Sequence, residues 1–300
     1  MRLSRLKFLA GGVLGVALGT AAAAFFGARP IAWLAWLTAQ ACVTSFQLMT
    51  HYSNDYFDRH GDRDARRTPF SGGSGALAER GLAPSAALIA ALACAGAGSV
   101  FAALLAAAFG RPLAAGFAIA VAILAWSYSA PPLRLCARGL GELDAALVVA
   151  VFVPLLGAAA QTGSFDPRIA AATFPGACAM FVMMLCVELP DAAGDAVAGK
   201  RHLIVRRGAP AAVPLIRRTI IATFAAAALG VGFGLPQGFG LLLGLAIPLG
   251  LGLARALPAA AAKRMKPGVA EGLAARGVAF FFVVALDGWL GCLAALPWRI

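Results

Sequence analysis

Long apolar runs, separated by short polar segments, fill most of the chain. Several continue for about twenty residues without a charge, which is long enough for an α-helix to cross a hydrocarbon core of about 30 Å. The breaks between them contain Gly/Pro pairs or charge clusters, such as "FGRP", "SAPPLRL" and "KRMKPG". The pattern predicts an all-α, polytopic membrane protein with about nine transmembrane helices around a central cavity, in one domain, 1–300. The predicted spans are 8–27, 31–53, 84–109, 112–130, 142–161, 168–189, 211–235, 238–257 and 277–297.

The N-terminal segment has two interpretations. Its basic start, apolar stretch and small residues are also typical of a signal peptide. However, the apolar run from Phe8 to Phe26 is long enough to span a bilayer, and further predicted spans follow it. We therefore interpret the segment as the first membrane helix.

Composition agrees with a membrane location. Apolar residues make up 61% of the chain and charged residues 13%, and a soluble domain of this size cannot bury that much apolar surface. The six cysteines are scattered, mostly inside apolar runs, without the spacing of a metal site. We expect them to be small core residues.

The distribution of basic residues predicts an orientation. With a cytoplasmic N-terminus, 21 of the 25 Lys and Arg residues fall on the cytoplasmic side. This follows the positive-inside rule and predicts a multi-pass protein of the cell inner (cytoplasmic) membrane. The net charge of +12 is explained in the same way, so we expect no nucleic-acid partner.

The second predicted span ends in the polar stretch "HYSNDYFDRHGD". Asn54, Asp58 and Asp62 are four residues apart, so on a helix they would share one face. A polar stripe inside a membrane usually faces a cavity or a partner helix. His51 could take part in proton removal or could be a buried, hydrogen-bonded histidine. The stripe continues upstream through Gln40, Thr44, Gln47 and His51.

A second acidic cluster follows the sixth predicted span. Glu188, Asp191 and Asp195 lie at its cytoplasmic end, so both clusters are on one side of the membrane. Carboxylate oxygens suit Mg²⁺, which is commonly shared between carboxylates and substrate phosphates. Basic residues flank both clusters, and cations beside a bound metal suit a diphosphate. These flanking residues are Arg59, Arg63, Arg66 and Arg67 at the first cluster and Lys200, Arg201 and Arg206 at the second.

Four segments resemble the UbiA superfamily of intramembrane prenyltransferases. They are "NDYFDRHGD", "YSAPPLRLCARGLGE", "DAAGD" and "GKRHLIVRRG", in this order along the chain. The resemblance implies a nine-helix fold and Mg²⁺-dependent transfer of a polyprenyl group from an allylic diphosphate to an aromatic acceptor. The isoprenoid tail would lie in a groove open to the lipid bilayer, and the active site would face the cytoplasm.

The resemblance also implies residue roles. Five side chains would hold two Mg²⁺ ions on the diphosphate: Asn54, Asp58, Asp62, Asp191 and Asp195. Arg67 and Lys200 would contact the diphosphate, with Arg134, or Tyr128 and Ser129, near the reacting end. Asp55 would help to order the following loop. The chain departs from the family pattern at Cys136, His202 and Glu188, of which Glu188 could add a third carboxylate to the metal site.

The segment "LRLCARGLGEL" is most similar to the branch containing 1,4-dihydroxy-2-naphthoate prenyltransferases of menaquinone synthesis. Alternative acceptors in this superfamily are 4-hydroxybenzoate, homogentisate and a tetrapyrrole. A transporter is the alternative from another functional class. Transporters place polar residues near the bilayer midplane, whereas here the carboxylates gather at the cytoplasmic helix ends, which favours the enzyme.

Overall fold

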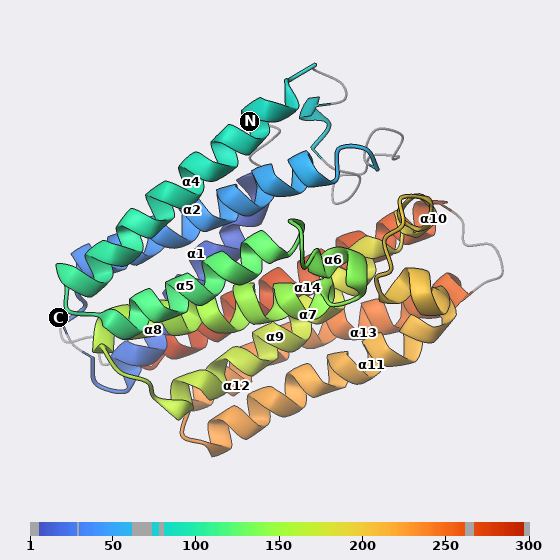
Figure 1. Ribbon diagram of the computed structural model, residues 1–300. Coiled ribbons are helices and arrows are strands. Elements are labelled where there is room, and N and C mark those ends of the chain that lie inside the picture. Colours follow the sequence, from blue (N-terminus) through green and yellow to red (C-terminus); the bar gives the residue numbers. More distant parts are fainter. Residues whose placement is uncertain (1–5, 29, 62–73, 78–80, 262–266, 297–300) are drawn as a thin grey trace.

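The computed structural model describes residues 6–28, 30–61, 74–77, 81–261 and 267–296, and every regular element in these ranges is helical. Helices run side by side in a bundle, and the short helices α6 and α10 lie at the same end of it (Figure 1). The elements are α1 (Leu6–Phe25), α2 (Trp33–Phe57), α4 (Pro84–Ala107), α5 (Pro112–Ser127), α6 (Leu135–Arg138), α7 (Gly141–Leu147), the π-helix η1 (Val148–Phe152), α8 (Val153–Thr162), α9 (Pro167–Glu188), α10 (Ala192–Val197), α11 (Leu203–Gly232), α12 (Gln237–Leu243), η2 (Gly244–Ala246), α13 (Ile247–Ala256), η3 (Leu257–Ala261) and α14 (Pro267–Ala294).

Seven helical segments of the described chain are long and apolar enough to cross a membrane. The apolar helix α5 is shorter, and α2 is as long as the others but carries the polar stripe. The predicted all-α membrane architecture is therefore confirmed, while the count of nine spans and the orientation stay predictions. Large apolar side chains such as Leu34, Ile89, Ile221 and Leu241 point outward, as lipid contact requires.

The buried side chains form two cores. One is built mainly from α1, α9, α11, α12 and α14, and the other from α2, α4, α5 and α8. Close helix contacts depend on small residues, as is usual in membranes. A Cβ atom added at Gly157 of α8 would lie 2.6 Å from the backbone oxygen of Val16 on α1. This leaves no room for a side chain between the two backbones.

Helix α2 continues past the predicted span 31–53. Its last helical residue is Phe57 and Asp58 is the C-cap, so Asn54 and Asp58 lie about one turn apart at its end. Arg59 stabilises this end, since its guanidinium donates a 2.7 Å hydrogen bond to the carbonyl of Tyr56, one of the last carbonyls of the helix, which have no partner within the helix. Asp62 itself lies outside the described residues.

The span predicted at 142–161 is one continuous segment with a π-helical turn inside it. The turn, η1, comes just before Pro154, the second residue of α8. Proline lacks an N–H and its ring clashes with the carbonyl four residues earlier, and a wider turn relieves both problems. A second irregularity lies in α11, where Gly208 has φ 77° and ψ 158° and kinks the helix.

Candidate active site

The C-terminal end of α2 contributes one half of the site. Asp58 is buried, with 5% of its surface exposed. Just before it on the helix, Asn54 donates a 2.9 Å hydrogen bond from its amide to the hydroxyl of Ser129. Asp55 points elsewhere, because its carboxylate accepts hydrogen bonds from the backbone N–H and the hydroxyl of Ser74. This contact ties α2 to the segment 74–77, while the expected role of Asp55 in ordering the loop stays a prediction, because residues 62–73 lie outside the described residues.

Lys200 joins this half to the second acidic cluster. Its ammonium nitrogen is 3.0 Å from Oδ2 of Asp58 and 3.1 Å from Oδ1 of Asp195. Asp191, the N-cap of α10, lines the same cavity as these two carboxylates. The predicted convergence of the two acidic clusters is therefore confirmed. The other oxygen of Asp58, Oδ1, is buried and has no hydrogen-bond partner among the described residues.

His202 links the second cluster to the end of α9. Its Nε2 is 3.1 Å from Oδ2 of Asp195, and its Nδ1 is 3.2 Å from Oε2 of Glu188. Burial favours the neutral imidazole, but the contacts with these two carboxylates outweigh it and raise the pKa of His202 to about 9. Burial likewise acts to raise the pKa of Asp195, yet the hydrogen bond from His202 and the charge of Lys200 keep that pKa below its ordinary value.

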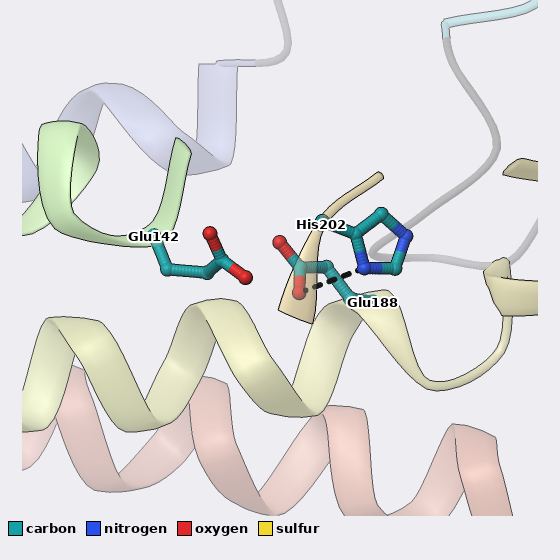
Figure 2. Close-up of side chains that lie close together, drawn as sticks. All are labelled: Glu142, Glu188 and His202. Atoms are coloured by element: carbon teal, nitrogen blue, oxygen red, sulfur yellow. Dashed lines mark ion pairs between the residues drawn. The ribbon is translucent and has the colours of Figure 1, made fainter. Parts of the chain in front are cut away.

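Glu142 adds a third carboxylate to the two that contact this histidine, those of Asp195 and Glu188. Figure 2 shows the carboxylates of Glu142, from α7, and Glu188, from the end of α9, pointing toward each other beside His202. Ligand atoms of the three residues lie within 4.8 Å of one another, so they could hold a metal ion. Oε1 of Glu142 also accepts a 2.8 Å hydrogen bond from the backbone N–H of Leu203, which starts α11.

The loop between α5 and α7 closes one side of the site. The N–H of Cys136 donates to the carbonyl of Tyr128, and the N–H of Arg201 donates to the carbonyl of Ala137, both at 3.0 Å. Gly139 allows the loop to meet residue 201: its φ is +77°, and a Cβ atom there would lie 2.8 Å from the Arg201 carbonyl. The loop thereby holds Tyr128 and Cys136 at the cavity.

One cavity of about 280 Å³ is lined by four of these acidic groups: Asp58, Glu188, Asp191 and Asp195. Its remaining wall is largely apolar, with Phe46 from α2, Val121 from α5 and Met180 from α9. The cavity thus combines a charged end with an apolar interior. The predicted site residues that line it are His51, Asn54, Asp58, Tyr128, Asp191, Asp195 and Lys200.

Other predicted site residues have different positions. Ser129 is buried behind Asn54 and reaches the site through the hydrogen bond between them. Arg134 is exposed and is not among the residues that line the cavity. Arg67, like Asp62, lies outside the described residues. In the upper part of the polar stripe, Gln40 and Thr44 bond to each other at 3.1 Å, while Gln47 reaches the cavity.

Sequence reasoning missed one carboxylate of the cavity wall, Asp144. Its position at the start of an apolar span indicates a favourable interaction with the helix dipole. The structure instead places Asp144 in the cavity wall, buried and 5% exposed. The one available signal is its position as the fourth residue of α7, one turn inside a span where a charge is costly.

Comparison with known proteins identifies the family. The model of the UbiA prenyltransferase family matches residues 13–286. The chain belongs to the UbiA prenyltransferase family. It is therefore a prenyltransferase with several membrane-crossing helices. Among curated proteins, none matches the sequence.

Solved structures share the UbiA fold along almost the whole chain. A UbiA homolog from Aeropyrum pernix K1 has a TM-score of 0.71 and 15% identity, covering 94% of this chain and 97% of the homolog. A UbiA homolog from Archaeoglobus fulgidus bound to DMAPP and Mg²⁺ has a TM-score of 0.67 and 16% identity, covering 93% and 98%. A structure described as digeranylgeranylglyceryl phosphate synthase has a TM-score of 0.67 and 16% identity, covering 98% and 97%.

Proposed function

We propose that the protein transfers a polyprenyl group from an allylic diphosphate to 1,4-dihydroxy-2-naphthoate, with Mg²⁺ as cofactor, in menaquinone synthesis. The observation that carries the proposal is the contact of the Lys200 ammonium with both Asp58 and Asp195, at the charged end of a largely apolar cavity. This end would receive the diphosphate, and the apolar part would receive the reacting end of the isoprenoid. The family membership supports the reaction class.

The charged end has the chemistry that a magnesium–diphosphate complex requires. Asp58 offers a buried oxygen without a partner in the described part of the chain, and Asp191 and Asp195 add carboxylates at the same cavity. Asn54, and Asp62 beyond the described residues, complete the proposed ligand set. When bound there, Mg²⁺ would neutralise the diphosphate and make it a better leaving group. The A. fulgidus homolog bound to DMAPP and Mg²⁺, and another structure bound to GPP and Mg²⁺, support this assignment.

Lys200 would then change partners. Its ammonium contacts two carboxylates, which in the loaded site would face metal ions instead. A primary ammonium can rotate toward phosphate oxygens without losing its charge. Arg67 is the second proposed diphosphate contact, and Arg134 lies on the exposed loop that closes the site. Lys200 and Arg67 would hold the leaving diphosphate after the carbon–oxygen bond breaks.

The apolar wall would protect the allylic cation. Water would capture such a cation at once, so a low-polarity pocket that excludes water is needed during transfer. The walls contributed by Phe46, Val121 and Met180 meet this need. Tyr128 also lines the cavity, and its ring could stabilise the cation. His51, on the same face of α2 as Asn54, would receive the proton that the acceptor ring releases.

The proposed setting is the inner membrane, with the N-terminus and the active site on the cytoplasmic side. The excess of Lys and Arg in the segments at this end supports the orientation. The similarity of the loop between α5 and α7 to the naphthoate branch supports the choice of acceptor.

The test uses purified protein in lipid nanodiscs with labelled geranylgeranyl diphosphate or longer homologues. Each is offered with 1,4-dihydroxy-2-naphthoate, 4-hydroxybenzoate or homogentisate, in Mg²⁺ or in EDTA. We expect a prenylated naphthoate product and diphosphate release in Mg²⁺ only. Transfer to another acceptor would replace the naphthoate assignment, and metal-independent transfer would refute the proposed role of the carboxylates.

A further inference from the structure

Asp144 is a carboxylate in the cavity wall that the proposed diphosphate site does not use. It is buried, it lines the cavity, and its Oδ1 has no hydrogen-bond partner among the described residues. The neighbouring acids differ from it. Glu142 accepts a backbone hydrogen bond, and Asp58 and Asp195 contact Lys200. Burying a carboxylate without a partner is costly, so a ligand that donates a hydrogen bond to it would remove the cost.

The surroundings of Asp144 determine which ligand fits. Ala145 and Val148, which follow it on the same helical segment, line the cavity with apolar surface. A hard divalent cation requires several oxygen ligands, which this wall does not supply. Gln47 from α2 brings a second buried, unpartnered oxygen, Oε1, to the same cavity. Hydrogen-bond acceptors beside apolar lining residues suit a flat apolar ligand that carries hydroxyl groups.

We propose that Asp144 accepts a hydrogen bond from an aromatic hydroxyl of the prenyl acceptor and selects acceptors that carry this hydroxyl. The inference rests on the proposed prenyl transfer and deepens it by naming the group that is recognised. A hydroxyl that donates to a carboxylate gains electron density on its oxygen. The ring carbons conjugated to that oxygen become more nucleophilic, so the same contact both orients the acceptor and favours its attack on the allylic carbon.

The experiment measures discrimination between a hydroxyl and its methyl ether. Steady-state transfer is followed in nanodiscs with 1,4-dihydroxy-2-naphthoate and with its 1-methoxy and 4-methoxy ethers. Wild type should prefer the free hydroxyl over one of the ethers by about ten- to a hundredfold in kcat/KM, which is the effect of a hydrogen bond to a charged group. Asp144→Leu should lose about the same factor with the hydroxylated acceptor and should no longer discriminate against that ether.

Three measurements separate this role from a structural one. Asp144→Leu should keep the KM for the prenyl diphosphate and the slow Mg²⁺-dependent release of diphosphate without acceptor. Asp144→Asn, which keeps a carbonyl oxygen and nearly the same shape, should fall between wild type and Asp144→Leu, and it carries the test if the leucine variant does not fold. Asp287→Asn is the matched control, because Asp287 is equally buried and has an unpartnered oxygen but does not line the cavity.

Each remaining outcome is decisive. Wild-type discrimination in Asp144→Leu would overturn the inference, and so would loss of diphosphate release, because Asp144 would then belong to the diphosphate end. A wild type that releases diphosphate but prenylates no hydroxylated acceptor would overturn the inference and leave the diphosphate site standing. A wild type that releases no diphosphate would refute the proposed function itself.

Discussion

Replacing Lys200 with methionine should destabilise the metal-free protein and make its stability strongly dependent on Mg²⁺. The ammonium is 3.0 Å from one carboxylate, of Asp58, and 3.1 Å from another, of Asp195, and its side chain is 16% exposed. At an effective dielectric constant of about 20, each contact is worth roughly 5 kcal/mol of Coulomb attraction. Desolvation of the lysine offsets most of this sum. The loss on breaking such pairs is about 3 kcal/mol, because two carboxylates remain close together without a counter-charge.

The measurement is thermal unfolding in nanodiscs, in EDTA and with increasing Mg²⁺. A loss of about 3 kcal/mol should lower the Tm of Lys200→Met in EDTA by roughly 5–10 °C. Mg²⁺ supplies the missing positive charge, so it should raise the Tm of the variant more than that of wild type. Turnover should fall by about a hundredfold or more, since the variant would lack the cation that we propose holds the leaving diphosphate.

The control for this experiment is Arg218→Met, which removes an exposed cation from α11 and should change the stability by less than about 0.5 kcal/mol. An unchanged Tm for Lys200→Met in EDTA would refute the bridging role of Lys200. Equal stabilisation of wild type and variant by Mg²⁺ would refute the conclusion that the metal and the ammonium serve the same carboxylates.

Three further predictions concern the site and the packing. Asp58→Ala and Asp191→Ala should abolish turnover while the protein still inserts into the membrane, and wild-type rates in either variant would contradict the metal assignment. Gly157→Val should cost about 1–3 kcal/mol in thermal unfolding through overlap with the α1 backbone, whereas Gly116→Ala, where nothing lies within 4 Å, should be neutral; equal effects would contradict the packing argument. His202 has its pKa raised to about 9 from 6.5, so its stabilising effect should be complete below about pH 6.5 and lost as the pH rises through 9. His202→Gln should therefore cost roughly 3 kcal/mol at pH 6 and much less at pH 10, and a cost independent of pH would exclude the ion pairs as its source.

Hydropathy could predict where membrane-crossing segments lie, but not where helices begin and end. The span predicted at 168–189 matches α9, Pro167–Glu188, because a proline and an acidic cluster happen to coincide with the helix ends. The span predicted at 277–297 starts ten residues inside α14, whose first residue is Pro267. The first ten residues of the helix include the charged side chains of Glu271 and Arg276 and precede the apolar run. The helix therefore begins before the apolar segment does.

The site was predictable in its residue types more than in its contacts. Acidic spacing and a family resemblance identify Asp58, Asp191, Asp195 and Lys200, which line the cavity. The contact between Lys200 and Asp58 joins residues far apart in the chain, and no local pattern encodes it. Asp144 was missed for a related reason. A local pattern assigns an acid at a helix start to the helix dipole, and only the tertiary fold shows that this one faces a cavity.

Buried oxygen atoms without a hydrogen-bond partner among the described residues lie at the cavity as well as outside it. Three of them line the cavity, on Gln47, Asp58 and Asp144. All three are hydrogen-bond acceptors, so the cavity attracts positive charge and hydrogen-bond donors. Because the two packed cores carry the stability of the fold, the cavity can keep these acceptors unsatisfied. Lys200 contacts the carboxylates of the charged end, where Mg²⁺ would also bind, and an aromatic hydroxyl would satisfy Asp144. A magnesium–diphosphate complex would thus match the carboxylates at the charged end, and a hydroxylated ring would match the acceptor oxygen of Asp144 in the same cavity.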